Sequence, residues 1–245
     1  MVSTQMWYKS QYVKWIWQIF NLAINNLGDL VNKMDENTIT ENTEVLMSLL
    51  YYRPGFSDTN FQIVIRIMQI VQRIASLSKS FARRHAAYGI EGIVEKLTDN
   101  KIKKTGVECL SVFCEVLGPQ TVFGLLYKIC VNHKTPKVIS EGCLFMTSAL
   151  IDFGLNTVEL KPLIDCIKQV LENPNPVVKQ SAVLLLAEMF KYMGAALRDQ
   201  LKDVKPALLV TIEQEFEKLS NLKPMTPAKK LRPSAVVPAA SATAS

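Results

Sequence analysis

Apolar residues recur with helical spacing along most of the chain, in blocks separated by short polar loops. Apolar side chains three and four residues apart share one face of a helix, so each block predicts a helix that buries one face. Thr40 is the expected N-cap of the second helix. The expected helices cover residues 17–34, 40–51, 61–77, 82–97, 102–117, 120–131, 137–153, 160–171 and 177–193, followed by a terminal unit of residues 195–219 whose last helix begins at Pro206.

The blocks repeat with a fixed period. A shift of 40 residues aligns Pro136 with Pro176 and Gly154 with Gly194, and residues 106–117 repeat the same helix opening at an offset of 36. A period of about 40 residues on two-helix units is the signature of HEAT and armadillo solenoids. The sequence therefore predicts an all-α, HEAT-repeat α-solenoid of about six helix pairs.

The chain divides into three segments. Residues 17–221 carry the regular blocks and form the expected HEAT-repeat domain. Residues 1–16 fit the pattern poorly and are interpreted as a divergent N-terminal segment, either a helix of poor pattern or a partly ordered arm. Residues 222–245 are rich in Pro, Ala and Ser, which predicts a basic, disordered linker or tail.

Composition narrows the class of protein. The chain has 245 residues, of which 49% are hydrophobic, and no uninterrupted apolar run reaches the roughly 18 residues of a membrane-spanning helix. Aromatic residues crowd positions 7–20, but no small-residue cleavage site follows, which disfavours a signal peptide and favours packing in the first repeat. The net charge is +6, of which residues 222–245 supply +4.

All the cysteines fall on apolar helical segments without a C-x-x-C spacing. They are Cys109, Cys114, Cys130, Cys143 and Cys166. This odd number indicates reduced core thiols in a cytosolic protein. His85 and His133 are the two histidines of the chain, too few for a His/Cys zinc cluster at suitable spacing, so no metal or cofactor is expected.

Basic residues gather in the loops within helix pairs, which a solenoid places along one edge. These loops carry Arg53 and Phe56, then Lys101 and Lys103, then Lys134 and Lys137, and then Asn175 and Lys179. A line of lysines with one exposed aromatic, Phe56, is suited to a flat acidic protein surface. Taken singly, each lysine is more often an ordinary solvated residue. A cation at a helix N-terminus opposes the helix dipole, however, so these lysines do not serve helix stability.

Motifs for enzyme chemistry are missing from the sequence. It has no Gly-rich phosphate loop, no H-E-x-x-H and no G-x-S-x-G, and two histidines are few for an acid–base pair. The sequence therefore predicts a binding protein without catalytic residues, and not an enzyme.

Several loop motifs resemble a known family. They are residues 53–62 (RPGFSDTNFQ), 118–123 (GPQTVF), 133–142 (HKTPKVISEG) and 203–209 (DVKPALL). Over about residues 17–219 the chain is similar to the TOG domains of the mini-spindles/colonic-hepatic-TOG class of microtubule polymerases. It is most similar to an internal TOG domain, third or later in an array.

The resemblance implies a HEAT paddle whose within-pair loops bind the curved αβ-tubulin heterodimer. It implies a role in microtubule plus-end polymerisation and spindle organisation, in the cytoplasm and on the cytoskeleton, including the spindle, centrosome and kinetochore. Trp17 would open the contact edge, although the basic residues that follow this Trp in the family are absent here. The other contacts would be Arg53, Phe56, Lys101, Lys103, Lys134, Lys137, Asn175 and Lys179. The implied module is monomeric, alone or within a longer multi-TOG chain, with no nucleic-acid or membrane partner.

Two other classes of function compete with tubulin binding. The first is a HEAT-repeat scaffold or adaptor for another acidic protein partner, which the same basic loops would recognise. The second is nucleic-acid binding by the tail, which rests on its four cations alone.

Overall fold

The computed structural model describes residues 4–51, 55–219 and 226–232, with side chains from residue 18 onward. Within these ranges the chain is helical apart from its loops and an extended C-terminal stretch, and it contains no strand. The predicted all-α class is confirmed. The described residues form two compact units, unit 1 up to residue 81 and unit 2 from residue 82 onward.

Unit 1 holds three helices and a short 3-10 turn. They are α1 (Thr4–Lys33), α2 (Glu36–Tyr51), η1 (Gly55–Ser57) and α3 (Phe61–Leu77). Helix α3 packs against both α1 and α2 and buries a broad apolar stripe that includes Ile63, Ile67 and Ile74. Such a wide stripe is what a helix needs when it has neighbours on two sides. The predicted bounds of α3 are confirmed at both ends.

The first two helices differ from the prediction. Helix α1 continues unbroken through residues 16 and 17, so the N-terminal segment is the helical alternative of the two proposed. Thr40 is not an N-cap, because α2 begins earlier, at Glu36. The carboxylate of Asp35 caps it by accepting from the Thr38 N–H at 2.8 Å. Thr40 instead lies inside the helix, where its hydroxyl accepts from the Lys79 N–H at 3.1 Å.

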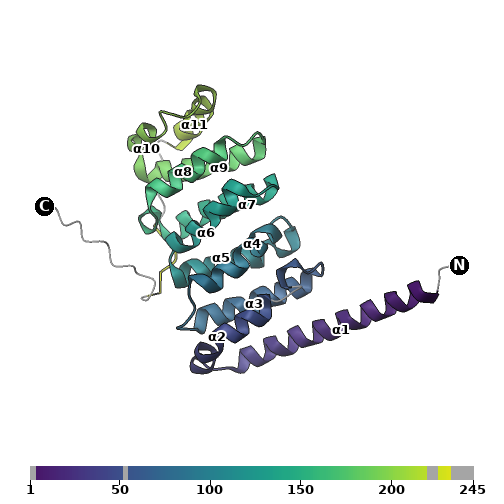
Figure 1. The fold of residues 1–245 in the computed structure, drawn as a ribbon. Helices are drawn as coiled ribbons and strands as arrows, with labels where there is room; N and C mark the ends of the chain where they lie inside the picture. Colours follow the sequence, from purple (N-terminus) through teal and green to yellow (C-terminus); the bar gives the residue numbers. More distant parts are fainter. Residues whose placement is uncertain (1–3, 52–54, 220–225, 233–245) are drawn as a thin grey trace. The chain divides into compact units, whose positions relative to one another are not determined.

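Unit 2 is a stack of helix pairs, visible in order in Figure 1. Its elements are α4 (Arg83–Lys96), α5 (Asn100–Leu117), α6 (Pro119–Asn132), α7 (Pro136–Phe153), η2 (Leu155–Thr157), α8 (Leu160–Leu171), α9 (Pro176–Met193), α10 (Ala195–Gln200) and α11 (Pro206–Leu219). Helix α7 packs against α6 of its own pair and against α9 of the next pair. Each pair therefore buries its apolar face on its neighbours, as expected of a solenoid.

Proline and glycine set the ends of these helices. Pro136 and Pro176 occupy the first position of α7 and α9, where a missing N–H costs nothing because that group has no partner inside the helix. Gly118 and Gly154 follow α5 and α7 with φ of +82° and +85°, a backbone region that other residues avoid. The period predicted from the sequence is thus a period of helix starts and stops.

The last pair closes unit 2 with an aromatic stack. Phe190 of α9 and Phe216 of α11 lie parallel, with ring centroids 4.1 Å apart. The guanidinium of Arg198 covers Phe190 at 4.9 Å from its centroid and pairs with Glu213 at 2.9 Å. This arrangement buries the end of α9 under a charged cover, which a terminal repeat requires.

The five cysteines are buried and none forms a disulfide, so their prediction as core thiols is confirmed. Burial raises the pKa of Cys166 to about 12, which keeps its thiol protonated at neutral pH. None of the described helices combines the length and hydropathy needed to cross a bilayer.

The predicted disordered tail is wrong for residues 226–232. This stretch lies in extended form on unit 2, where the Lys229 N–H donates to the Asp152 carbonyl at 2.9 Å and the Arg232 N–H donates to the Glu115 carbonyl at 2.8 Å. Loop-like composition did not reveal these partners because they belong to helices far away in the sequence. The rest of the tail lies outside the described residues.

Two glycines provide a matched test of the stack. A Cβ on Gly142 of α7 would lie 2.7 Å from the buried Cys130 sulfur, whereas a Cβ on Gly124 of α6 would meet nothing within 4 Å. We expect Gly142→Ala to lower the free energy of unfolding by about 1–3 kcal/mol, because the short Cys130 side chain has little room to move. Gly124→Ala should raise it by about 0.5–1 kcal/mol through helix propensity. Equal stabilisation of both variants in chemical denaturation would contradict this packing.

Candidate functional site

The loops of residues 97–99, 133–135 and 172–175, each with the first turn of the following helix, form one edge of unit 2, here named the loop edge. Figure 1 shows them as the turns of successive stacked pairs. Two of them end in a side-chain cap: Asp99 accepts from the Lys101 N–H and Asn175 accepts from the Val177 N–H, both at 2.9 Å. The predicted contact residue Asn175 therefore has a structural role of its own.

Lys101 and Lys134 are exposed on the loop edge. Lys101 is the second residue of α5, two positions after its cap Asp99. Lys134 stands in the middle of the next loop, between His133 and Thr135. Within the described residues, no ion pair or hydrogen bond engages the Lys134 ammonium. Both predicted residues are exposed, and Lys134 is placed to meet a partner.

Lys103 has a partner inside the protein. Its ammonium pairs with the Glu141 carboxylate of α7, with nitrogen–oxygen distances of 2.9 and 2.8 Å. The Glu141 side chain is 11% exposed and that of Lys103 is 41% exposed. A carboxylate so nearly buried needs a cation, so Lys103 ties α5 to α7.

Lys137 makes a second tie between neighbouring pairs. Its ammonium donates to the carbonyl oxygen of Thr98 at 2.6 Å, which joins the start of α7 to the preceding loop. Lys137 is exposed all the same, so one side of its ammonium still faces solvent. Its first role is to satisfy a carbonyl that the end of α4 leaves without a helical partner.

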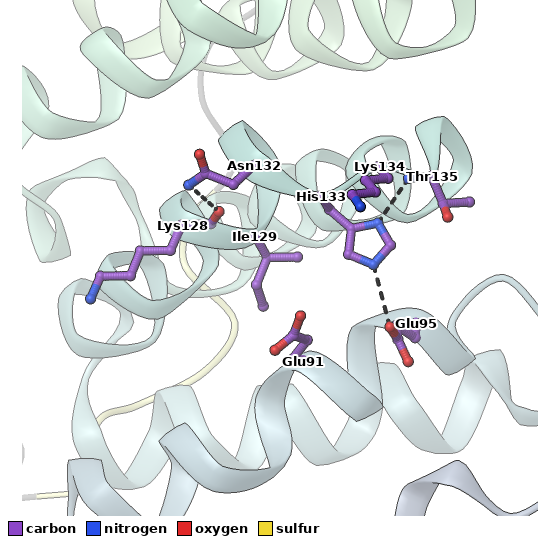
Figure 2. A pocket seen from close by; sticks show the side chains of 8 residues that line it. All are labelled: Glu91, Glu95, Lys128, Ile129, Asn132, His133, Lys134 and Thr135. Carbon is purple, nitrogen blue, oxygen red and sulfur yellow. Dashed lines mark hydrogen bonds and ion pairs between the residues drawn. The ribbon is translucent and has the colours of Figure 1, made fainter.

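His133 is the third tie, shown in Figure 2. Its Nδ1 accepts from the Thr135 N–H at 3.0 Å, and its Nε2 lies 3.3 Å from a carboxylate oxygen of Glu95 on α4. Because Nδ1 accepts, Nε2 carries the proton and donates to Glu95. These two hydrogen bonds of His133 hold the loop that carries Lys134 in place.

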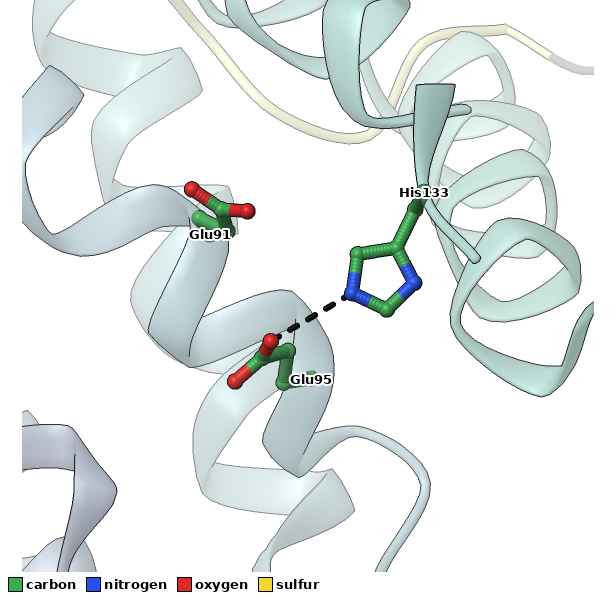
Figure 3. Close-up of side chains that lie close together, drawn as sticks. All are labelled: Glu91, Glu95 and His133. Carbon is green, nitrogen blue, oxygen red and sulfur yellow. Dashed lines mark hydrogen bonds and ion pairs between the residues drawn. The ribbon is translucent and has the colours of Figure 1, made fainter. Parts of the chain in front are cut away.

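Glu91, Glu95 and His133 lie close together in Figure 3, with one ligand-type atom from each within 4.8 Å of the others. These residue types can hold a divalent cation. The proton on Nε2 and the bond from Thr135 to Nδ1 leave the imidazole no lone pair for a metal, however. The cluster therefore serves as an inter-repeat tie.

The same residues line a hollow of about 640 Å³ between α4 and the end of α6. Figure 2 shows Lys128 and Lys134 on the α6–α7 side of this hollow and Glu91 and Glu95 on its α4 side. Acid and base thus stand on opposite walls. A partner that inserts here meets a basic wall and an acidic one, which restricts what fits.

The remaining predicted residues have different outcomes. Phe56 is not an exposed aromatic: it is 7% exposed and packs on Tyr51 with ring centroids 5.7 Å apart. The 3-10 turn η1 directs its ring inward, which the sequence of a Pro-Gly turn does not reveal. Arg53 and the side chain of Trp17 lie outside the described residues, and both stay predictions. Lys179 is half-buried on the first turns of α9.

The sequence analysis missed the partners of these lysines, although a signal for them exists. The pairs Lys103–Glu141, His133–Glu95 and Lys137–Thr98 are separated by 38, 38 and 39 residues. Each separation is close to one repeat. Matching polar residues at about one repeat would have found the two side-chain pairs, but not the bond from Lys137 to a backbone carbonyl.

Comparison with known proteins places these features in a family. The family model described as XMAP215/Dis1/CLASP, TOG domain, matches residues 59–216. Protein MOR1 of Oryza sativa subsp. japonica is 36% identical over 210 residues, which cover 85% of this chain. The TOG3 domain of Drosophila melanogaster Mini spindles superposes with a TM-score of 0.80 at 27% identity, covering 88% of this chain and 94% of that domain.

A more distant structure shares the fold. It concerns tubulin recruitment and assembly by microtubule polymerases with TOG domain arrays, and it has a TM-score of 0.69 at 17% identity, covering 88% of this chain and 46% of that one. The present chain spans only 10% of the length of MOR1. It therefore corresponds to one part of such a relative.

The Lys103 tie can be tested against a neighbour on the same helix. We expect Lys103→Ala to lower the free energy of unfolding by about 1–2 kcal/mol, between the values for exposed and buried pairs, because Glu141 loses its partner. Lys104→Ala, an exposed site with the same charge change, should alter it by less than about 0.5 kcal/mol. Urea unfolding of the two variants measures this difference. Indistinguishable unfolding midpoints would show that the Lys103–Glu141 pair contributes nothing to stability.

Proposed function

The chain belongs to the XMAP215/Dis1/CLASP TOG-domain family, and from this premise we propose that it binds αβ-tubulin through its within-pair loops. The observation that carries the proposal is the loop edge of unit 2, where Lys101 and Lys134 are exposed on loops that other side chains hold in place. An edge of cations fits an acidic protein surface. Among the contacts expected in unit 2, these two lysines carry the proposal.

Preorganisation is what separates this edge from ordinary surface lysines. The hydrogen bonds of His133 and the Lys137–Thr98 bond hold two successive loops together in the unbound protein. Ordering a loop on binding costs free energy, and loops that are already ordered avoid that cost. Lys134 is therefore presented at a fixed position relative to the preceding repeat.

The proposed role is binding without chemistry, as one module of a longer microtubule polymerase at growing plus ends and in the spindle. The nearly buried Lys103–Glu141 pair supports the division of roles, because it uses a cation for the scaffold and leaves others for the partner. Trp17 and Arg53 remain proposed contacts of unit 1. Lys137, Asn175 and Lys179 remain proposed contacts of unit 2 in addition to their local contacts.

A HEAT adaptor for another acidic protein remains the second candidate. It would use the same lysines, since charge complementarity alone does not choose between acidic surfaces. The hollow lined by Glu91 and Glu95 favours a partner whose surface is not acidic throughout, because these carboxylates repel a uniformly acidic surface. Binding to purified αβ-tubulin separates the candidates directly.

We expect the double variant Lys101→Ala/Lys134→Ala to weaken binding to free αβ-tubulin by on the order of 5- to 30-fold, since each exposed cation contributes up to about 1 kcal/mol. The loss should shrink as salt is added, because exposed charges are screened. Fluorescence anisotropy measures the affinity, and circular dichroism verifies the fold.

The matched control is Lys161→Ala/Lys230→Ala. It removes the same charge from two exposed positions, at the start of α8 and in the C-terminal stretch, away from the loop edge. Its affinity for tubulin should stay close to that of the unaltered chain. Equal affinities for both double variants would refute the loop edge as the binding surface, and absence of any tubulin binding by the unaltered chain would favour the adaptor.

A further inference from the structure

Residues 226–232, here named the strap, cross the opposite edge of unit 2, where α5 and α7 end. Two backbone bonds fix it: the Lys229 N–H to the Asp152 carbonyl at 2.9 Å, and the Arg232 N–H to the Glu115 carbonyl at 2.8 Å. Figure 1 shows this stretch as a yellow chain beside the helix pairs of unit 2. The strap thus touches two successive repeats.

The Lys229 side chain anchors the strap in a cluster of oxygens. Its ammonium lies 2.7 Å from the Ser111 hydroxyl oxygen, 3.2 Å from a Glu115 carboxylate oxygen and 3.8 Å from one of Asp152. Glu115 and Asp152 lie in the last turns of α5 and α7, where the helix dipole also favours a cation. One ammonium therefore contacts two carboxylates from neighbouring repeats.

Gly154 makes room for the strap. Its φ of +85° suits glycine, and a Cβ there would lie 3.1 Å from the ring of Pro227. The turn after α7 thus presents bare backbone where the proline packs. The space at the Gly154 turn and the carboxylates of Glu115 and Asp152 therefore both favour binding of residues 226–232.

The two adjacent lysines of the strap have different surroundings. Lys229 points to the acidic pair, with 38% of its side chain exposed, while Lys230 is an exposed residue with no ion pair in the described part of the chain. Alternation is the rule in extended backbone, where successive side chains face opposite ways. A general attraction between a basic tail and the domain would not distinguish them.

We propose that the ends of α5 and α7 form a docking surface for an extended, lysine-bearing segment, and that the strap is its occupant. Docking fixes where the chain leaves unit 2. The segment departs from the helix-end edge at the level of α5 and α7, and not from the end of the stack at α11. Whatever follows residue 232 therefore starts from a defined point.

This exit lies away from the loop edge. Helix α5 begins at the loop edge and ends at the strap, and its 18 residues span about 27 Å at the ordinary rise of an α-helix. A chain that continues from the strap starts about one helix length from Lys101. The docking surface therefore places the start of the C-terminal continuation away from the proposed binding loops, and Lys230 stays exposed.

Hydrogen exchange of the whole chain tests the docking, with Lys229→Ala and Lys230→Ala as a matched pair. In the unaltered chain, the amides of Lys229 and Arg232 should exchange at least about 10-fold more slowly than in an unstructured peptide, because both are hydrogen-bonded. Lys229→Ala should return them toward the unstructured rate, and Lys230→Ala should leave them protected. Helix α7 should stay protected in both variants.

A second variant changes the docking surface and leaves the sequence of the strap unaltered. Glu115→Lys places a cation where the Lys229 ammonium rests, so the strap should lose protection while the α7 amides keep theirs. Unprotected amides at Lys229 and Arg232 of the unaltered chain would overturn the proposal. Equal effects of Lys229→Ala and Lys230→Ala would overturn it as well, since only one of them contacts the acidic pair.

Discussion

Contacts between groups one repeat apart hold the neighbouring helix pairs of unit 2 in register. Separations of 38 and 39 residues join the first two pairs through His133–Glu95 and Lys137–Thr98. Separations of 39 and 35 residues join the later pairs through the bond from the Glu159 N–H to Gln120 and through Lys168–Asp203. A solenoid lacks a central core, so each interface must specify its own alignment. Apolar packing supplies most of the stability, and these polar ties set the register.

The same requirement divides the lysines into two groups. Lys103 and Lys137 satisfy groups on the preceding or following repeat, and Lys229 does so at the opposite edge. Lys134 is held in place by its neighbours and points its charge outward. Removing a lysine of the first group changes the scaffold, and removing one of the second group changes recognition. A basic edge counted from the sequence mixes both, which is why its residues differ so much in what they do.

Fold and repeat were predictable from the sequence because helix starts and stops are local. Pro136, Pro176 and Gly154 mark them directly, and the bounds of the helices they limit differ little from the prediction. The docking of the strap was not predictable, because its partners are distant in sequence. The inward turn of Phe56 was not predictable either, because it depends on the 3-10 turn η1, which a Pro-Gly sequence does not reveal. Thr40 failed as a cap for a subtler reason. Asp35, five residues earlier, competes for the same role and starts the helix sooner.

The central claim is that the loop edge meets αβ-tubulin while the helix-end edge, with its strap, does not. Hydrogen exchange of the whole chain with and without purified αβ-tubulin tests this most directly. The account predicts slower exchange on binding in residues 97–101, 133–137 and 173–179, and unchanged exchange in the turns after α5 and α7. Slowing confined to those turns and to residues 226–232, with no change in the loops, would contradict it.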